Sequence, residues 1–331
     1  MAAASSSTGC VKSLNTIRVE WIVAFFCDPR EKVFGKVLRS MGVVLFGLFL
    51  TCRAFGSCPR ERLFGYPDPK ELSSWLVQEA KRYPGRMQVF SLGQSVRGHP
   101  LTLAVVGSGR DKEAILINGA HHGDEKITVL VALGFVDFLN KNFDHPEVKA
   151  LLGRYQFVVL PLVNPDGYCA HSRLNAQGID INRDYLSPSE DAAGDSGFKT
   201  PEARLIRDLV AKKRFLGALA LHSGDEAVYW PLGDSPRPSN HHAVFEDLAR
   251  STAARMGFVR SMQSYFDYPT QGEFIDYVYR KYQILGLTVE VSRDHLPQAG
   301  RHRGIITQGI DGILSYVASL GTRRDGAKSP F

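Results

Sequence analysis

The 331-residue sequence contains no run of about 20 uninterrupted apolar residues, so a conventional membrane-spanning helix is not expected. It also shows neither an internal repeat nor a low-complexity linker, and its composition is that of an ordinary globular protein. Cysteine is scarce. The five cysteines are Cys10, Cys27, Cys52, Cys58 and Cys169. Four of them lie in the first 58 residues, so we expect no disulfide within the body of the chain, and cysteine does not decide the redox compartment.

The body of the chain also lacks an excess of positive charge. The net charge of the whole chain is +6, but residues 1–65 alone hold nine basic and four acidic residues. About one unit of net charge is therefore left for the remaining 266 residues. A nucleic-acid partner is not expected.

The N-terminal region has the layout of a secretory signal. An apolar run at residues 41–50 follows Lys36 and Arg39 and precedes the small residues of Ala54-Phe55-Gly56. Cleavage after Gly56, lipid attachment at Cys58 and an uncleaved membrane-attached segment are the alternatives, and a buried helix of the mature fold is another interpretation. We predict a leader at 1–57, with translation starting downstream of residues 1–32, and an extracytoplasmic location.

From residue 66 the hydrophobic pattern alternates between helices and strands. Helical patterns begin near Asp68, Lys126, Thr200, His241 and Gly304. Residues 87–93 and 101–107 flank a turn signal and predict a hairpin. Continuous apolar runs at 114–119, 157–164, 215–223 and 284–292 are typical of strands buried on both faces. We therefore predict one α/β domain over 66–322, with a mixed, mostly parallel sheet flanked by helices, and a tail at 323–331.

A metal site is indicated by Gly119-Ala120-His121-His122-Gly123-Asp124-Glu125, which lies between a buried strand and a helix. His122 and Glu125 can aim an imidazole and a carboxylate at one ion, and His222 ends another buried strand. Two histidines, one carboxylate and an open fourth position make a catalytic zinc site. His121 and Asp124 repeat the same spacing, and we favour His122 with Glu125.

Four further segments follow this motif in order: residues 163–168 (VNPDGY), 178–183 (GIDINR), 220–223 (ALHS) and 288–291 (TVEV). Together with the first motif they resemble the M14 zinc carboxypeptidases, over roughly residues 68–320. The resemblance implies one zinc ion held by His122, Glu125 and His222. It also implies that Glu290 is the general base for a metal-activated water.

The same resemblance implies roles for four more residues. Arg173 matches the arginine that stabilises the oxyanion, and Asn182 with Arg183 matches the pair that binds a substrate's terminal carboxylate. Tyr268 matches a mobile substrate-binding tyrosine, although Tyr265 is close to it. Simpler interpretations are open for four of the site residues: Glu290 paired with Arg293, Arg173 as a solvated loop arginine, Arg183 paired with Asp184, and Tyr268 as a packed loop aromatic. Asp166 is a candidate to support a metal ligand from behind.

The sequence departs from the digestive members of the family in two places. Asp124 stands where those members carry an arginine, which is closer in style to compact bacterial murein peptide amidases and would tolerate a cationic group. Ile275 stands at a position that helps set specificity, and it argues against a pocket for basic side chains. We predict a peptide or amide hydrolase acting near a free carboxylate, with murein peptides as a candidate substrate. The alternatives are a deacylase of small N-acyl amino acids and a non-catalytic peptide-binding relic.

Overall fold

The computed structural model describes residues 58–109, 112–186 and 197–326, and the side chains of these residues up to 321. The expected signal segment at 41–50 and the expected start site lie outside the described residues. Within the described part of the chain, no helix combines the length and the apolar character that crossing a bilayer requires.

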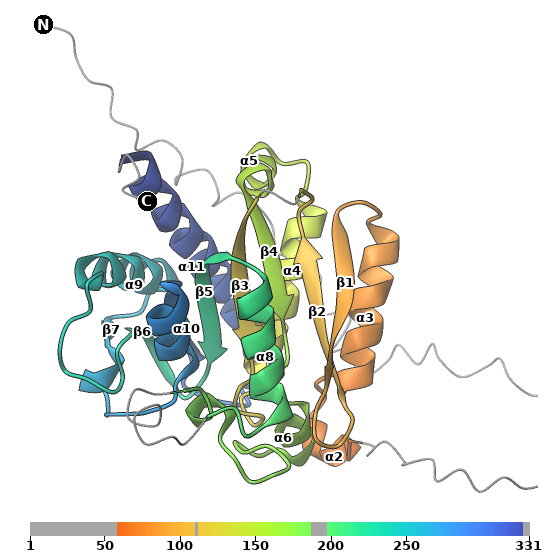
Figure 1. Cartoon of the computed structure of the whole chain (residues 1–331). Coiled ribbons are helices and arrows are strands. Elements are labelled where there is room, and N and C mark those ends of the chain that lie inside the picture. The colour runs from red at the N-terminus through yellow and green to blue at the C-terminus, as the bar shows by residue number, and fades with distance from the viewer. Residues whose placement is uncertain (1–57, 110–111, 187–196, 327–331) are drawn as a thin grey trace, which may run out of the picture.

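An eight-stranded mixed sheet forms the centre of the domain, in the order β1-β2-β4-β3-β5-β8-β6-β7 (Figure 1). The strands are β1 (Met87–Gln94), β2 (Pro100–Val106), β3 (Glu113–Gly119), β4 (Tyr155–Leu160), β5 (Phe215–His222), β6 (Asp225–Trp230), β7 (Arg260–Gln263) and β8 (Leu285–Ser292). Strands β4, β3, β5 and β8 are parallel neighbours. The pairs β1–β2, β2–β4 and β6–β8 are antiparallel, and β7 runs parallel to β6. This confirms the predicted α/β domain with a mixed sheet.

Helices cover both faces of the sheet (Figure 1). They are α2 (Arg60–Leu63), α3 (Pro69–Arg82), α4 (Ile127–Lys141), α5 (Pro146–Arg154), α6 (Pro165–Ala170), α8 (Pro201–Lys212), α9 (His242–Met256), α10 (Phe274–Tyr282) and α11 (Ala299–Gly326). Two begin where the sequence predicts a start. The Asp68 side chain accepts hydrogen bonds from the first turn of α3, and Thr200 caps α8 before Pro201.

Alternate residues of the central strands face two separate apolar layers. Ile115 and Ile117 of β3 belong to the core that packs against α4, α9 and α11, whereas Leu116 belongs to the core against α8 and α10. Because both faces are buried, each central strand reads as a continuous apolar run. Burial of one such side chain contributes about 1.5–3 kcal/mol. The two layers fix β3, β5 and β8 side by side, and the carboxyl ends of these parallel strands therefore lie at one edge.

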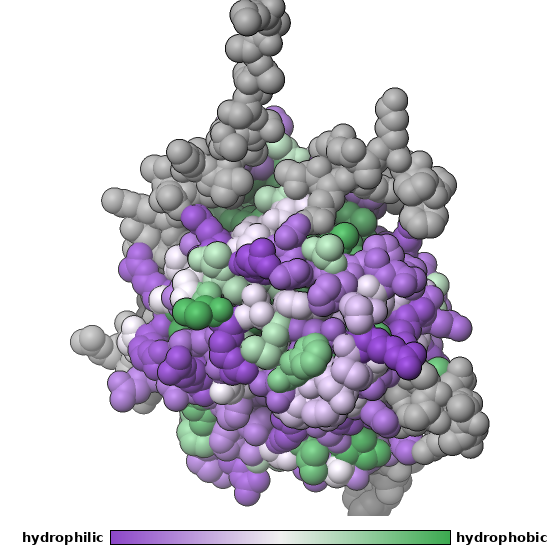
Figure 2. Space-filling model, turned by 90° about the vertical axis from the view of Figure 1, so that its left-hand side faces the viewer, coloured by the Kyte–Doolittle hydropathy of each residue, from purple (hydrophilic) through white to green (hydrophobic). Residues whose placement is uncertain are grey.

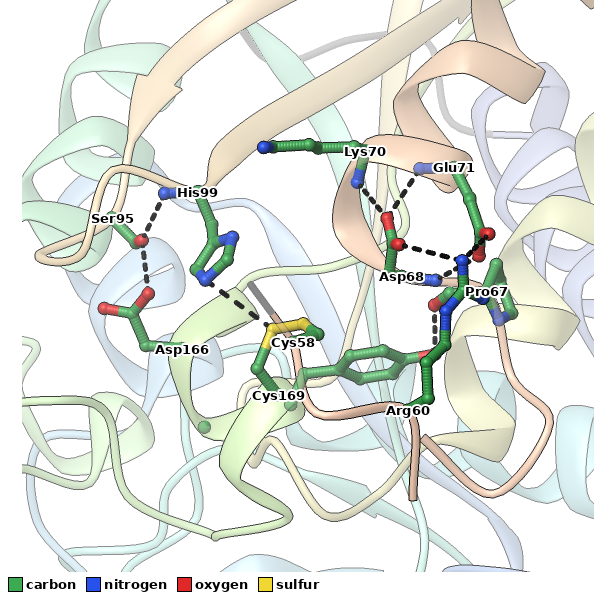
Figure 3. The surroundings of a disulfide bond; sticks show 12 residues. Cys58, Arg60, Pro67, Asp68, Lys70, Glu71, Ser95, His99, Asp166 and Cys169 are labelled. Atoms are coloured by element: carbon green, nitrogen blue, oxygen red, sulfur yellow. Dashed lines mark hydrogen bonds and ion pairs between the residues drawn. A yellow bond between two sulfur atoms is a disulfide. The ribbon is translucent and has the colours of Figure 1, made fainter. Parts of the chain in front are cut away.

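A disulfide joins the start of the described chain to α6. Cys58 and Cys169 are bonded across a sequence separation of 111 residues (Figure 3). Our expectation that the body holds no disulfide is therefore wrong, because Cys58, which we assigned to the leader region, belongs to the described fold beside α6. The bond also occupies the sulfur that a lipid at Cys58 would need, so lipid attachment there is incompatible with this state of the protein.

Candidate metal centre and active site

The three predicted metal ligands meet at the carboxyl ends of β3 and β5. His122 and Glu125 lie in the turn between β3 and α4, and His222 is the last residue of β5. The turn is held against the segment after β4, since the Asn164 amide donates a hydrogen bond to the Ala120 carbonyl. All three ligand side chains are buried, with 1–4% of each residue exposed.

The atoms that these side chains present to one another suit a metal ion. His122 Nδ1 lies 2.7 Å from Glu125 Oε1, and His222 Nδ1 lies 3.0 Å from Glu125 Oε2. The two Nδ1 atoms are 3.2 Å apart. Tetrahedral zinc at 2.0–2.1 Å from each ligand needs donor separations of about 3.3 Å. The donor set, the spacing and the burial therefore fit zinc.

One other cluster among the described residues has the composition of a metal site. It consists of Cys58, His99 and Cys169. Its two sulfurs are joined in the disulfide, and His99 Nε2 lies 3.7 Å from Cys169 Sγ (Figure 3). We therefore assign the metal to the histidine–glutamate cluster.

Asp180 supports His122 from behind. Its Oδ1 lies 3.2 Å from His122 Nε2, so Asp180 can accept the proton of that nitrogen and leave Nδ1 free to bind a metal. Burial alone would raise the pKa of Asp180, but its hydrogen bond with His122 and the nearby positive charges outweigh burial, and the pKa lies below its usual range. Our candidate for this role, Asp166, is wrong. It accepts hydrogen bonds from Ser95 Oγ and the Arg97 amide instead (Figure 3).

Glu290 lies beside the ligands on β8, directly across the ladder from His222. It lines the cavity, and its Oε2 is buried without a hydrogen-bond partner in the described structure. Burial raises the pKa of Glu290 well above its usual value, and the neighbouring Glu125 raises it further. The alternative pairing with Arg293 is not found, because Arg293 lies 3.3 Å from a Glu226 oxygen.

Arg173 approaches the same centre from the loop after α6. Its Nε donates to Asp180 Oδ2 at 2.9 Å, and its Nη1 lies 3.3 Å from His122 Nδ1. One aspartate thus orients both the arginine and a metal ligand. The guanidinium is held with its cationic end toward the ligand cluster.

The three predicted substrate-binding residues are brought together. Arg183 donates through Nη1 to the Asn182 carbonyl at 2.8 Å and through Nη2 to the Tyr268 hydroxyl at 3.1 Å. The alternative pairing of Arg183 with Asp184 is not found, because the Asp184 carboxylate accepts from Lys199 and Thr200. Tyr268 is 54% exposed and lines the cavity, so it is not packed in the interior.

A cavity of about 450 Å³ connects these groups. Besides the predicted residues and Gly224, its lining consists of polar or charged side chains: Ser223, Asp225, Tyr229, Arg260, Ser264, Asp267, Glu273, Thr288 and His295. Neither Asp124 nor Ile275, the two residues from which the sequence argued specificity, is part of this lining. Ile275 is 1% exposed in the core under α10.

Sequence reasoning missed three side chains of the site. Asp180 stands two residues before Asn182 in a motif that we had already singled out, and this position was the available signal. His295 was not singled out by the sequence, yet its Nδ1 lies 3.0 Å from Ser223 Oγ and both residues line the cavity. Glu273 gave no signal, because only the start of α10 turns its side chain toward the cavity.

Comparisons with known proteins identify the family of the chain. A family model described as zinc carboxypeptidase, Peptidase M14, matches residues 72–308. Carboxypeptidase SOL1 of Arabidopsis thaliana is 25% identical over 77% of this chain and 56% of its own length. The inactive metallocarboxypeptidase ECM14 of Blastomyces gilchristii is 27% identical over 55% of this chain and 37% of its own length. The chain thus spans little more than half the length of the first of these relatives.

Solved structures share the fold. Bovine thrombin-activatable fibrinolysis inhibitor, in complex with a tick carboxypeptidase inhibitor, superposes with a TM-score of 0.69 at 20% identity, over 79% of this chain and 99% of the other. The family model covers most of the described domain and includes every ligand and cavity residue discussed above. The chain belongs to the M14 family of zinc carboxypeptidases, which are peptide-bond hydrolases.

Proposed function

We propose that this chain is a zinc metallocarboxypeptidase that hydrolyses the peptide or amide bond next to a free carboxylate. The observation that carries the proposal is the meeting of two groups in one cavity. His122, Glu125 and His222 make a three-ligand site beside Glu290, and Arg183 presents a guanidinium next to Tyr268. A hydrolase needs the first group, and recognition of a terminal carboxylate needs the second.

Zinc, when bound, polarises the scissile carbonyl and makes water acidic enough to be deprotonated near neutral pH. Glu290 takes the proton of the attacking water and returns it to the leaving amine. The Arg173 guanidinium acts against burial and favours the ionised form of Glu290, and a bound zinc ion would favour that form further. Arg173 stabilises the negative charge that develops on the carbonyl oxygen, and Asp180 keeps its guanidinium in place. Asn182 and Arg183 hold the substrate's carboxylate, with Tyr268 over it.

The candidate substrates are peptides that end in a free carboxylate, and murein stem peptides are among them. The cavity is lined mainly by polar and charged side chains, which suits a polar terminal residue better than a large apolar one. We also propose an extracytoplasmic location. The signal-like layout of residues 36–56 supports it, and so does the Cys58–Cys169 disulfide, because such bonds persist in oxidising compartments.

Two other functions would use the same cavity. A deacylase of N-acyl amino acids needs the same metal and glutamate, and a carboxylate clamp would serve it equally. A peptide-binding relic has a precedent in the inactive relative, but the ligand set and Glu290 are complete in this chain. Substrate assays separate the three.

The test is hydrolysis by the purified, zinc-loaded protein. We expect release of the C-terminal amino acid from N-blocked peptides, loss of this activity on chelation and its recovery with zinc. Glu290→Gln should lower kcat by at least about a hundredfold while leaving peptide binding intact. Glu226→Gln, a carboxylate on the neighbouring strand β6, is the matched control and should behave as the wild type. Cleavage of N-acyl amino acids alone would support the deacylase, and binding without turnover would support the relic.

A further inference from the structure

Glu273 turns a carboxylate into the cavity instead of capping its own helix. It occupies the N-cap position of α10, but its side chain accepts no capping hydrogen bond. Its residue is 6% exposed, and it lines the cavity. Glu273 Oε2 is 3.1 Å from Ser264 Oγ, while Oε1 lies 3.6 Å from Arg183 Nη1 and makes only a loose ion pair. A carboxylate has about four acceptor sites, so this one keeps capacity for another donor.

Three oxygen atoms from separate segments converge near Gly233. An ideal Cβ on Gly233 would lie 2.4 Å from Thr270 Oγ1, 3.0 Å from Glu273 Oε2 and 3.2 Å from Ser264 Oγ. Thr270 is 7% exposed, and its hydroxyl oxygen is buried with no hydrogen-bond partner in the described structure. A buried hydroxyl without a partner costs about 1–3 kcal/mol unless a ligand or water satisfies it.

The charge at this place is negative. Asp276 lies behind Glu273 and accepts a hydrogen bond from the Gly233 amide at 2.8 Å. Burial, and then the charge of Glu273, raises the pKa of Asp276 to about 8, so Asp276 is mostly neutral at pH 7. The Gly233 amide donates to that neutral acid, and Arg280 is paired with Asp234. Of these two neighbouring acids, Glu273 is the one that lines the cavity.

We propose that Glu273, Ser264 and Thr270 form a subsite for the side-chain ammonium of the substrate's C-terminal residue, as in lysine or another diamino acid. An ammonium group carries three donors, and three acceptor oxygens from three segments match that number. The subsite adjoins the guanidinium of Arg183, which holds the terminal carboxylate in the proposed function on which this inference rests. One residue can therefore place its carboxylate on Arg183 and its side chain on Glu273. This proposal places the basis of specificity at Glu273, which lines the cavity, and not at Asp124 or Ile275, which do not.

The test compares two substrates that differ chiefly in the charge of one side chain, benzoyl-glycyl-lysine and benzoyl-glycyl-norleucine. The zinc-loaded wild-type protein should show kcat/KM at least about tenfold higher for the lysine substrate. Glu273→Gln should lower kcat/KM for lysine by roughly 10- to 100-fold and change it for norleucine by less than about threefold. Thr270→Val removes only the unpartnered hydroxyl, and it should lower lysine turnover selectively by several-fold.

Asp144→Asn is the control, since Asp144 pairs with Arg86 on the surface and is not part of the cavity lining. If Glu273→Gln weakens turnover of both substrates equally, Glu273 only positions Arg183 and the subsite is refuted. If the wild-type protein cleaves both substrates but does not prefer lysine, the subsite alone is refuted. If the wild-type protein cleaves no peptide, the proposed function falls and the subsite falls with it. Should Glu273→Gln not fold, Thr270→Val decides by the same comparison.

Discussion

Loss of the Cys58–Cys169 disulfide should destabilise the domain by several kcal/mol. The bond closes a loop across a sequence separation of 111 residues. The loop-entropy relation gives about 4.8 kcal/mol for a loop of this length at 25 °C. Globular domains have total stabilities of only about 5–15 kcal/mol, so this is a large fraction. The expected effect is easily measured.

The bond also ties α2 to the helix that precedes the arginine loop. Cys169 lies in α6, and the loop that carries Arg173 follows it directly. The α6 N-cap, Asn164, is hydrogen-bonded through its side chain to the carbonyls of His121 and Arg173. Breaking the disulfide should therefore lower the free energy of unfolding and also loosen a segment that forms part of the metal site.

Urea unfolding of the zinc-loaded protein is the assay. Two samples are compared with the untreated wild-type protein: a variant with both cysteines changed to alanine, and the wild-type protein treated with a phosphine reductant. In each, the urea concentration at the unfolding midpoint should be lower by roughly 1–2 M. A dithiol reductant is avoided because it competes for zinc. Unchanged midpoints in both samples would refute the reasoning, since the two sulfurs would then contribute nothing to holding the fold. A drop in the variant without a drop on reduction would instead point to lost packing.

Three further predictions concern the site and its surroundings. Asp180→Asn should weaken zinc binding by about 10- to 100-fold in competition with a chromogenic chelator, because the acceptor of His122 loses its negative charge; unchanged affinity would contradict this. Arg173→Ala should lower kcat by about 100- to 1,000-fold with a small change in KM; a change in KM alone would place Arg173 in ground-state binding. Burial is the main cause that raises the pKa of Asp276 to about 8, so the folded protein holds this proton more tightly than the unfolded chain does. The resulting contribution to stability is complete below pH 4 and is lost as the pH rises towards 8. Asp276→Asn keeps an acceptor for the Gly233 amide and should stabilise the domain by a few kcal/mol at pH 8 and less at pH 5 in thermal melts; an equal effect at both values would contradict this.

The fold was predictable where one physical signal dominated. The central strands are buried on both faces, and they are recognisable as apolar runs at 114–119, 215–223 and 284–292. The starts of α3 and α8 carry their capping residues in sequence. Strands β6 and β7 were not predicted. Strand β7 is the edge strand and β6 lies next to it, and only part of each strand is buried, so neither forms a long apolar run.

The site was predictable to the extent that it repeats a sequence motif. The metal ligands, Glu290 and Arg183 could be named because they fall at the ends of recognisable strands or in recognisable loops. Glu273 could not be named, since its role depends on where the first turn of α10 sits relative to Gly233 and Ser264. Cys58 was misjudged because the contact that pairs it with Cys169 spans 111 residues of the chain and leaves no local pattern.

The side that carries α9, α10 and β6 is mainly hydrophilic, with apolar residues scattered over it and not joined in one patch (Figure 2). This surface gives no sign of a broad apolar docking site.

Diffraction data collected on either side of the zinc absorption edge would test the central claim most directly. The account predicts one anomalous peak, about 2.0–2.2 Å from Nδ1 of His122, Nδ1 of His222 and the Glu125 carboxylate, with Glu290 beside it. A peak at Cys58, His99 and Cys169 with none between the two histidines would contradict the account, and so would a zinc-loaded crystal with no peak at either place.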